Sequence, residues 1–220
     1  MPEVSIILPT RNEVQVVGPL IDEIKLLPFD KEIIVVDYKS TDGTREVVLS
    51  KDVILIDEEK RGKGTALIRG FKEASGRYIV TLDADGTYPV EEVVRIVTFL
   101  KLGLGAVLGW RRYKERNSMF WVHRLGNYLL SLLASVLYLH SVHDINTGMK
   151  GFRSSILPNL KLSSKDFTIE ADIFINLAEG PDAFVEIPIR YLPRLDGSQP
   201  KLSMWDGFKI GWFLVKRRIS

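Results

Sequence analysis

The amino-acid sequence predicts an α/β fold in which helices flank a mostly parallel central sheet. Short runs rich in β-branched residues alternate with helix-length amphipathic segments through the first half of the 220 residues. Polar residues cluster after three of these runs, where buried strands are expected to emerge into solvent. We expect strands over residues 4–8, 32–37, 53–56, 78–82 and 106–109.

Four amphipathic helices are expected between these strands. Pro28, Gly76 and Gly103 punctuate them. Strands that alternate with helices are typical of a parallel sheet covered on both faces. The expected helices span residues 13–27, 43–50, 63–74 and 91–101.

The second half contains a long apolar segment. No acidic residue occurs from Arg116 to His143, and a helix over 117–140 would be about 36 Å long. His123, Arg124 and Asn127 interrupt it, so its uninterrupted apolar stretch is shorter than the ~18 residues of a membrane span. The sequence therefore favours a helix at a membrane interface or buried inside the protein, and a core helix on the sheet fits equally well.

A last amphipathic segment ends the chain. Trp205, Phe208 and Trp212 precede the basic run Lys216–Arg218, an order that suits a membrane–water interface. Core packing explains the same spacing. We expect one domain over residues 1–220, with 117–142 and 203–218 as candidate membrane-interface helices.

Composition excludes several classes of protein. Hydrophobic content of 45% and charged content of 26% exclude a largely disordered chain. The absence of cysteine excludes disulfides and thiolate metal sites. The N-terminus lacks the basic region of a signal peptide, which predicts a cytoplasmic protein. The net charge of +2 conceals a basic cluster at residues 111–116 that could attract phosphate groups, and we expect no nucleic-acid partner.

The tripeptide Asp83-Ala84-Asp85 follows the apolar run 78–82 and predicts a metal site. Residues two apart in an extended segment share a face, so both carboxylates can address one cation. Mg2+ or Mn2+ binds one or two carboxylates and completes its coordination with phosphate oxygens and water. The alternative is an ordinary Asp-Gly turn at Asp85–Gly86.

Four segments, in this order, resemble the motifs of family 2 glycosyltransferases: residues 8–13, 35–44, 61–64 and 83–86. Three later segments, 146–153, 186–189 and 194–197, are similar to the dolichyl-phosphate mannose or glucose synthase branch. The resemblance covers residue 4 to about 201. It implies the nucleotide-diphospho-sugar transferase fold, of the glycosyltransferase A type.

The resemblance also implies where a nucleotide binds. The expected donor-binding residues are Pro9, Arg11, Glu13, Asp37, Lys63, Asp83, Ala84 and Asp85. Asp37 is the candidate for the base, because a carboxylate can accept the imide hydrogen of uracil or the amino hydrogens of guanine. A strand-end cap is the alternative for Asp37. Neither a Walker A loop nor a Gly-x-Gly-x-x-Gly pattern is present, which argues against a P-loop protein and a dehydrogenase.

The implied reaction is an inverting displacement at the anomeric carbon of a nucleotide sugar. A metal held by Asp85, with Asp83 in support, would neutralise charge on the departing diphosphate. A hydroxyl acceptor would need a general base, for which Glu170 and Asp172 are the candidates. A phosphate acceptor would need cations instead. The resemblance favours Arg111, Arg124 and Arg194 for this role over Arg112 and Arg153.

Four positions depart from the family pattern. Tyr38 stands where a second aspartate is usual, Arg11 replaces a tyrosine, and Thr87 replaces a glutamine near the metal. The segment 197–202 is one residue longer than usual, which affects the placement of Lys201. His123, His140 and His143 receive no role, because their spacing matches no tetrahedral metal site.

The sequence thus predicts transfer of a hexose from a GDP-mannose or UDP-glucose type donor to a polyprenyl (dolichyl) phosphate. The prenyl tail would lie along residues 121–139, with peripheral contact at the cytoplasmic face of a membrane. Two alternatives remain. One is transfer onto a glycan hydroxyl, and the other is a noncatalytic nucleotide-sugar-binding subunit.

Overall fold

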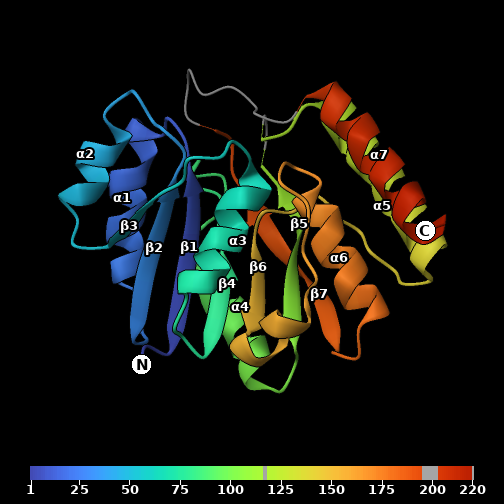
Figure 1. Cartoon of the computed structure of the whole chain (residues 1–220), viewed down its shortest axis with the longest axis horizontal. Helices are drawn as coiled ribbons and strands as arrows, with labels where there is room; N and C mark the ends of the chain where they lie inside the picture. Colours follow the sequence, from blue (N-terminus) through green and yellow to red (C-terminus); the bar gives the residue numbers. More distant parts are fainter. Residues whose placement is uncertain (116–117, 195–202, 220) are drawn as a thin grey trace.

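The computed structural model describes residues 1–115, 118–194 and 203–219, and in these ranges seven strands form one sheet (Figure 1). The strands are β1 (Val4–Thr10), β2 (Lys31–Asp37), β3 (Ile54–Asp57), β4 (Tyr78–Thr81), β5 (Ala106–Lys114), β6 (Lys150–Arg153) and β7 (Phe184–Tyr191). Their order is β3-β2-β1-β4-β6-β5-β7. Only β6 is antiparallel to its neighbours, so the predicted mostly parallel sheet is confirmed.

Helices connect the strands in the predicted pattern. They are α1 (Val14–Lys25), α2 (Thr44–Leu49), α3 (Lys63–Glu73), α4 (Glu91–Lys101), α5 (Trp121–Tyr138), α6 (Ile169–Glu179) and α7 (Met204–Ile219), with a 3-10 helix η1 (Ser154–Asn159). The first four agree with the predicted ranges to within two residues at each end. The strands β6 and β7 and the helix α6 are additions to the predicted elements.

Alternating side chains of the strands build two cores, one on each face of the sheet. In β1, Ile6 and Leu8 pack with apolar side chains of α1 and α4, whereas Ile7 packs with α3 and α6. This alternation explains why the strands of the first half read as continuous apolar runs, since both of their faces are covered.

The helices α5 and α7 form a separate layer, which packs on α6 and lies beside the sheet (Figure 1). Only small parts of each are buried: Ser131, Ala134 and Tyr138 of α5, and Ile210 and Leu214 of α7. The contacts of α5 are mainly with α7 and α6, and Trp121, Leu125, Tyr128, Leu132 and Val136 are exposed, so this arrangement does not support a core helix packed on the sheet. Helix α5 begins at Trp121.

Parallel strands bring their carboxyl ends to one edge of the sheet. Thr10 pairs with Asp37, Asp37 pairs with Asp57, and Ile7 pairs with Thr81, two residues before Asp83. Segments from widely separated parts of the sequence consequently meet at this edge, where ligands of open α/β sheets bind.

Candidate active site

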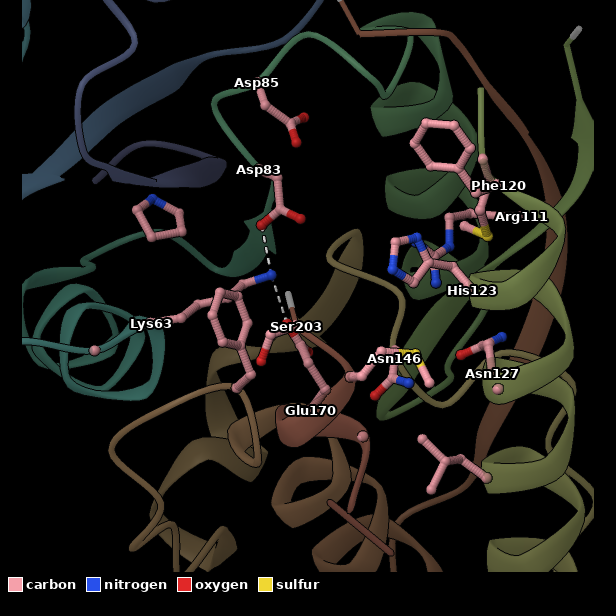
Figure 2. A pocket seen from close by; sticks show the side chains of 18 of the residues that line it. Lys63, Asp83, Asp85, Arg111, Phe120, His123, Asn127, Asn146, Glu170 and Ser203 are labelled. Atoms are coloured by element: carbon pink, nitrogen blue, oxygen red, sulfur yellow. Dashed lines mark ion pairs between the residues drawn. The ribbon is translucent and has the colours of Figure 1, made fainter. Parts of the chain in front are cut away.

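One large cavity lies at the carboxyl edge of the sheet (Figure 2), and residues of both α5 and α7 line its continuation. Its volume is about 1230 Å3. One end is charged, and its Asp, Glu, Lys and Arg side chains are Arg11, Glu13, Arg61, Lys63, Asp83, Asp85, Arg111, Glu170 and Arg194. The other end is mainly apolar, with Leu129, Leu130 and Leu133 of α5 facing Phe208, Trp212 and Val215 of α7.

A chain of alternating charges runs beneath the charged end. The Nζ atom of Lys63 lies 2.5 Å from Oδ1 of Asp83 and 2.7 Å from Oε1 of Glu170 (Figure 2). Glu170 also pairs with Lys150, which is 1% exposed. Burial alone would lower the pKa of Lys63, but Asp83 and Glu170 raise it overall, and Lys63 in turn lowers the pKa of Asp83. Both groups are therefore ionised at neutral pH.

Two glycines allow Lys63 to reach this position. A Cβ atom at Gly62 would lie 1.9 Å from the carbonyl oxygen of Lys165, and one at Gly64 would lie 2.2 Å from that of Ser164. The backbone amide of Thr65 donates to the same Lys165 oxygen at 3.1 Å. The Gly-Lys-Gly sequence thus serves a close approach of two backbones, which positions the lysine at the start of α3.

Asp85 is held by two kinds of donor. Its Oδ1 accepts hydrogen bonds from the backbone amide and the hydroxyl of Thr87, at 3.1 and 2.6 Å. Its Oδ2 lies 2.6 Å from Nη2 of Arg194. Burial opposes the charge of Arg194, yet Asp85 raises its pKa. Thr87, which departs from the family pattern, therefore orients the carboxylate on one side.

Asp83 and Asp85 both line the cavity, and a turn follows them. Gly86 has φ of 73°, a left-handed conformation that favours glycine, so the predicted Asp-Gly turn is present as well. Gly148 leaves room for Asp83, since a Cβ atom there would lie 2.1 Å from Oδ2. The metal and turn interpretations are thus compatible at this tripeptide.

The donor set fits a divalent cation only with help from a ligand. Within the described residues, no group of three or more His, Cys, Asp or Glu side chains could hold a metal ion. Two carboxylates suffice for Mg2+ or Mn2+ when diphosphate oxygens and water complete the coordination shell. In this structure Lys63 and Arg194 pair with these carboxylates, so a cation would compete with them.

Arg111 enters the cavity from β5 and is held by Asp144. The guanidinium forms a two-pronged pair with Asp144, with both N–O distances 2.7 Å. Asn127 of α5 donates to the same carboxylate at 2.9 Å. Burial opposes ionisation of both partners, but their pairing raises the pKa of Arg111 and lowers that of Asp144.

Most of the predicted site residues line the cavity, and three do not. Pro9, Arg11, Glu13, Lys63, Asp83, Ala84, Asp85, Arg111, Glu170 and Arg194 line it, whereas Asp37, Arg124 and Asp172 are not part of the lining. The carboxylate of Asp37 accepts from the backbone amide of Ser40 at 3.0 Å and from its hydroxyl at 2.5 Å. This is the strand-end cap, while the neighbouring Tyr38 lines the cavity.

Asp172 is fully buried and holds a loop. It accepts hydrogen bonds from the backbone amides of Ser163 and Ser164 at 2.8 and 2.9 Å. This placement does not support a general base at Asp172, because its oxygens face the protein. Arg124 is exposed on α5. Arg116 and Lys201, which the sequence placed near the site, lie outside the described residues.

Sequence reasoning missed Lys150 and Asp144. Both are almost completely buried, and each pairs with a side chain that lines the cavity. Lys150 lay within the quoted motif 146–153, and its apolar neighbours Met149 and Phe152 were the available signal of burial. Asp144 had no comparable local signal, since its partner Arg111 is 33 residues away.

The family profile of glycosyl transferase family 2 matches residues 5–160. The chain is 29% identical over 215 residues to a dolichyl-phosphate hexose transferase of Haloferax volcanii, covering 97% of this chain and 93% of that one. It is 31% identical over 184 residues to a dolichol-phosphate mannosyltransferase of Pyrococcus furiosus, covering 79% and 52%. A third relative, the glycosyltransferase AglJ of Haloferax volcanii, is 28% identical, and the chain spans 66% of its length.

Solved structures show the same fold. The glucosyl-3-phosphoglycerate synthase of Mycobacterium tuberculosis, in complex with Mn2+, UDP and glucosyl-3-phosphoglycerate, matches with a TM-score of 0.79 at 21% identity. The match covers 99% of this chain and 80% of the synthase. A complex of that synthase with Mg2+ and UDP gives a TM-score of 0.78. Fold, sequence motifs and family profile agree, and the chain belongs to glycosyl transferase family 2 as an enzyme of the glycosyltransferase A type.

Proposed function

We propose that the enzyme transfers a hexose, with inversion, from a nucleotide diphosphate sugar to a polyprenyl phosphate, with Mg2+ or Mn2+ as cofactor. The observation that carries this proposal is the continuity of one cavity from a charged end to an apolar groove. A polyprenyl phosphate has the same division, with an anionic head and an apolar tail. The name of the Haloferax dolichyl-phosphate hexose transferase, which aligns over nearly the whole length of both chains, supports this acceptor class.

The charged end of the cavity contains the residues proposed to bind the nucleotide-sugar donor. When bound at Asp83 and Asp85, a divalent cation would offset negative charge that develops on the departing diphosphate. Lys63 and Arg194 supply further positive charge at the same carboxylates. Pro9, Arg11 and Glu13 line the cavity at the end of β1, where we place the nucleotide.

The ion pairing of the carboxylate of Glu170 favours an anionic acceptor over a hydroxyl acceptor. A hydroxyl needs a base to take its proton, whereas a phosphate oxygen is already charged. Glu170 is the one base candidate of the sequence that lines the cavity, and it is ion-paired with both Lys63 and Lys150. Arg111, with its bidentate geometry, suits a phosphate.

Membrane contact is proposed through α5 and α7. Exposed apolar side chains occur along both helices: Trp121, Leu125, Tyr128, Leu132 and Val136 on α5, and Trp205, Phe208 and Trp212 on α7. The basic residues Lys216, Arg217 and Arg218 occupy the last turn of α7. None of the described helices is both long and apolar enough to cross a bilayer. We propose peripheral contact at the cytoplasmic face, with these side chains at the interface.

The test is transfer of radiolabelled sugar from a panel of GDP- and UDP-sugars to dolichyl phosphate in detergent with Mn2+. We expect labelled lipid from the wild type and none from Asp85→Ala. Asp22→Ala is the matched control, because Asp22 is an exposed carboxylate that pairs with Lys51 on the surface. Donor binding without any labelled lipid would contradict the proposal and support a glycan acceptor or a noncatalytic role.

A further inference from the structure

The position of Arg111 depends on one buried carboxylate. Arg111 lies on the α5 side of the cavity, across from Asp83 and Asp85 (Figure 2). Its partner Asp144 is 1% exposed and lies in the segment between α5 and β6. Neither the family motifs nor the proposed chemistry assigns a role to Asp144.

Four donors saturate the carboxylate of Asp144. Its Oδ2 accepts from Nε and from the backbone amide of Arg111, at 2.7 and 3.0 Å. Its Oδ1 accepts from Nη2 of Arg111 at 2.7 Å and from Nδ2 of Asn127 at 2.9 Å. This arrangement fixes the plane of the guanidinium, because two parallel hydrogen bonds to one carboxylate restrict rotation about the Cδ–Nε bond.

The same contacts leave one nitrogen of Arg111 for a ligand. Nε and Nη2 are engaged by Asp144, and the described residues provide no hydrogen-bond partner for Nη1. The ring of Tyr191 lies under the guanidinium, with its centroid 5.0 Å from Cζ. Asp144 holds the edge of the guanidinium and Tyr191 covers its face, so Nη1 is the nitrogen that the described residues leave without a partner, on a side chain that lines the cavity.

The backbone at Asp144 is held by a second carboxylate, that of Glu186. Glu186 of β7 accepts the backbone amide of Asp144 at 3.1 Å through Oε1. Its Oε2 accepts the backbone amide of His143 at 2.7 Å and lies 2.8 Å from the ring Nδ1 of His143. The support therefore extends from the sheet through Glu186 and Asp144 to Arg111.

We propose that Asp144 is a positioning residue, which holds Arg111 so that Nη1 donates to the phosphate of the acceptor. Through Asn127, the same carboxylate ties the position of Arg111 to α5, the helix proposed to contact lipid. The pair also compensates the charge of Arg111, so Arg111 acts as an oriented donor more than as a free cation. This inference rests on the proposed function, because the phosphate belongs to the proposed acceptor.

The kinetic test is a double-mutant cycle of Asp144→Asn and Arg111→Lys with the lipid acceptor. An asparagine cannot accept both prongs, so the guanidinium turns, and we expect kcat to fall about 10- to 100-fold, as for a misplaced catalytic group. The donor KM should stay unchanged. If Asp144 acts through Arg111, the double variant is no slower than the slower single variant. Multiplication of the two effects would overturn the proposal.

A second readout does not depend on the acceptor. The Nε–H signal of Arg111 in 1H–15N spectra is identified by its loss in Arg111→Lys, and we expect it to move in Asp144→Asn. An unchanged signal would overturn the proposal even if no lipid product forms. Absence of lipid product from the wild type would instead refute the proposed function, which the spectra do not test.

The matched control is Glu92→Gln. Glu92 is a buried carboxylate on α4, which pairs with Arg95 at 2.5 Å and accepts the backbone amide of Arg190 at 3.1 Å. It does not line the cavity. We expect this variant to be less stable but to keep its kcat and its Arg111 signal at temperatures where it is folded.

Discussion

The two ends of the cavity are built in opposite ways. At or beside the charged end, four carboxylates have cationic partners: Asp83 with Lys63, Asp85 with Arg194, Glu170 with Lys150, and Asp144 with Arg111. At the apolar end, between α5 and α7, the large side chains of Phe208 and Trp212 are 68% and 66% exposed. At the charged end, ion pairs within the protein neutralise these carboxylates. At the apolar end, large apolar side chains remain exposed to solvent.

The two ends therefore gain affinity for their ligands in different ways. Ion pairs in a buried site are costly to break, so a charged ligand binds by exchanging partners that are already oriented. An exposed apolar surface gains about 25 cal/mol for each Å2 that a lipid covers, with little orientation. The charged end should therefore be sensitive to single changes, and the apolar end should tolerate them.

The largest effect is expected from Lys63→Ala. This variant leaves Asp83 and part of Glu170 without their cation, and breaking a buried pair costs about 3–5 kcal/mol. We expect a lower free energy of unfolding in urea and loss of transferase activity. Lys39→Ala is the control, because the Lys39–Glu59 pair is exposed to solvent and should contribute little to stability. If the two variants lowered the free energy of unfolding equally, buried and exposed ion pairs would not differ in the way we expect.

A substitution in the groove tests the apolar end. Gly207 of α7 lines the cavity, and a Cβ atom there would meet nothing within 4 Å. Gly207→Leu should therefore fold, and its side chain should occupy space for the prenyl tail. We expect kcat/KM for the lipid acceptor to fall about 10-fold, or about 1.4 kcal/mol, with donor binding by calorimetry unchanged. Gly207→Ala, which adds one methyl group, is the smaller control, and unaltered kinetics with Gly207→Leu would place the tail elsewhere.

The substitution Arg194→Ala should have a smaller effect, and it should strengthen Mn2+ binding instead of weakening it. Because Arg194 pairs with Oδ2 of Asp85, it competes with a divalent cation for that oxygen. Arg194→Ala should therefore bind Mn2+ about 3- to 10-fold more tightly without nucleotide, a change of about 0.7–1.4 kcal/mol. Titration followed by electron paramagnetic resonance measures this directly. Arg190→Ala, on the surface beside Glu91, serves as control, and weaker Mn2+ binding in Arg194→Ala would show that the arginine supports the metal site.

The smallest effect is the pH dependence of stability. The pKa values of Asp83 and Asp144 are lowered from 3.8, since Lys63 and Arg111 offset the cost of burial. A lowered carboxyl pKa contributes stability above the ordinary value, and this stability is lost as pH falls through the folded-state pKa. We expect these pairs to contribute a nearly constant free energy of unfolding between about pH 5 and about pH 8, a range above the ordinary carboxyl pKa of about 4. This contribution should be lost below about pH 4. Urea denaturation across this range checks it, and Lys63→Ala should weaken the acid dependence.

The amino-acid pattern was enough to predict the elements of the first half and the position of the Asp83–Asp85 tripeptide at the end of a strand. Both depend on local information: the period of apolar residues distinguishes strand from helix, and parallel strands must place their carboxyl ends together. The bounds of α4 agree with those read from the sequence for the same reason. The family motifs added the fold type and most of the charged residues that line the cavity.

Long-range packing, in contrast, settles which carboxylates face the cavity and which cations pair with them. Asp37 and Asp172 have the same chemistry as Asp83, yet one caps a strand end and the other holds a loop. The partners Lys63 and Glu170 are more than a hundred residues apart in the sequence, and nothing local to either residue specifies the other. The exposure of α5 was likewise undecided, because an apolar helix has the same sequence pattern in a core and at an interface, and its neighbours alone distinguish the two.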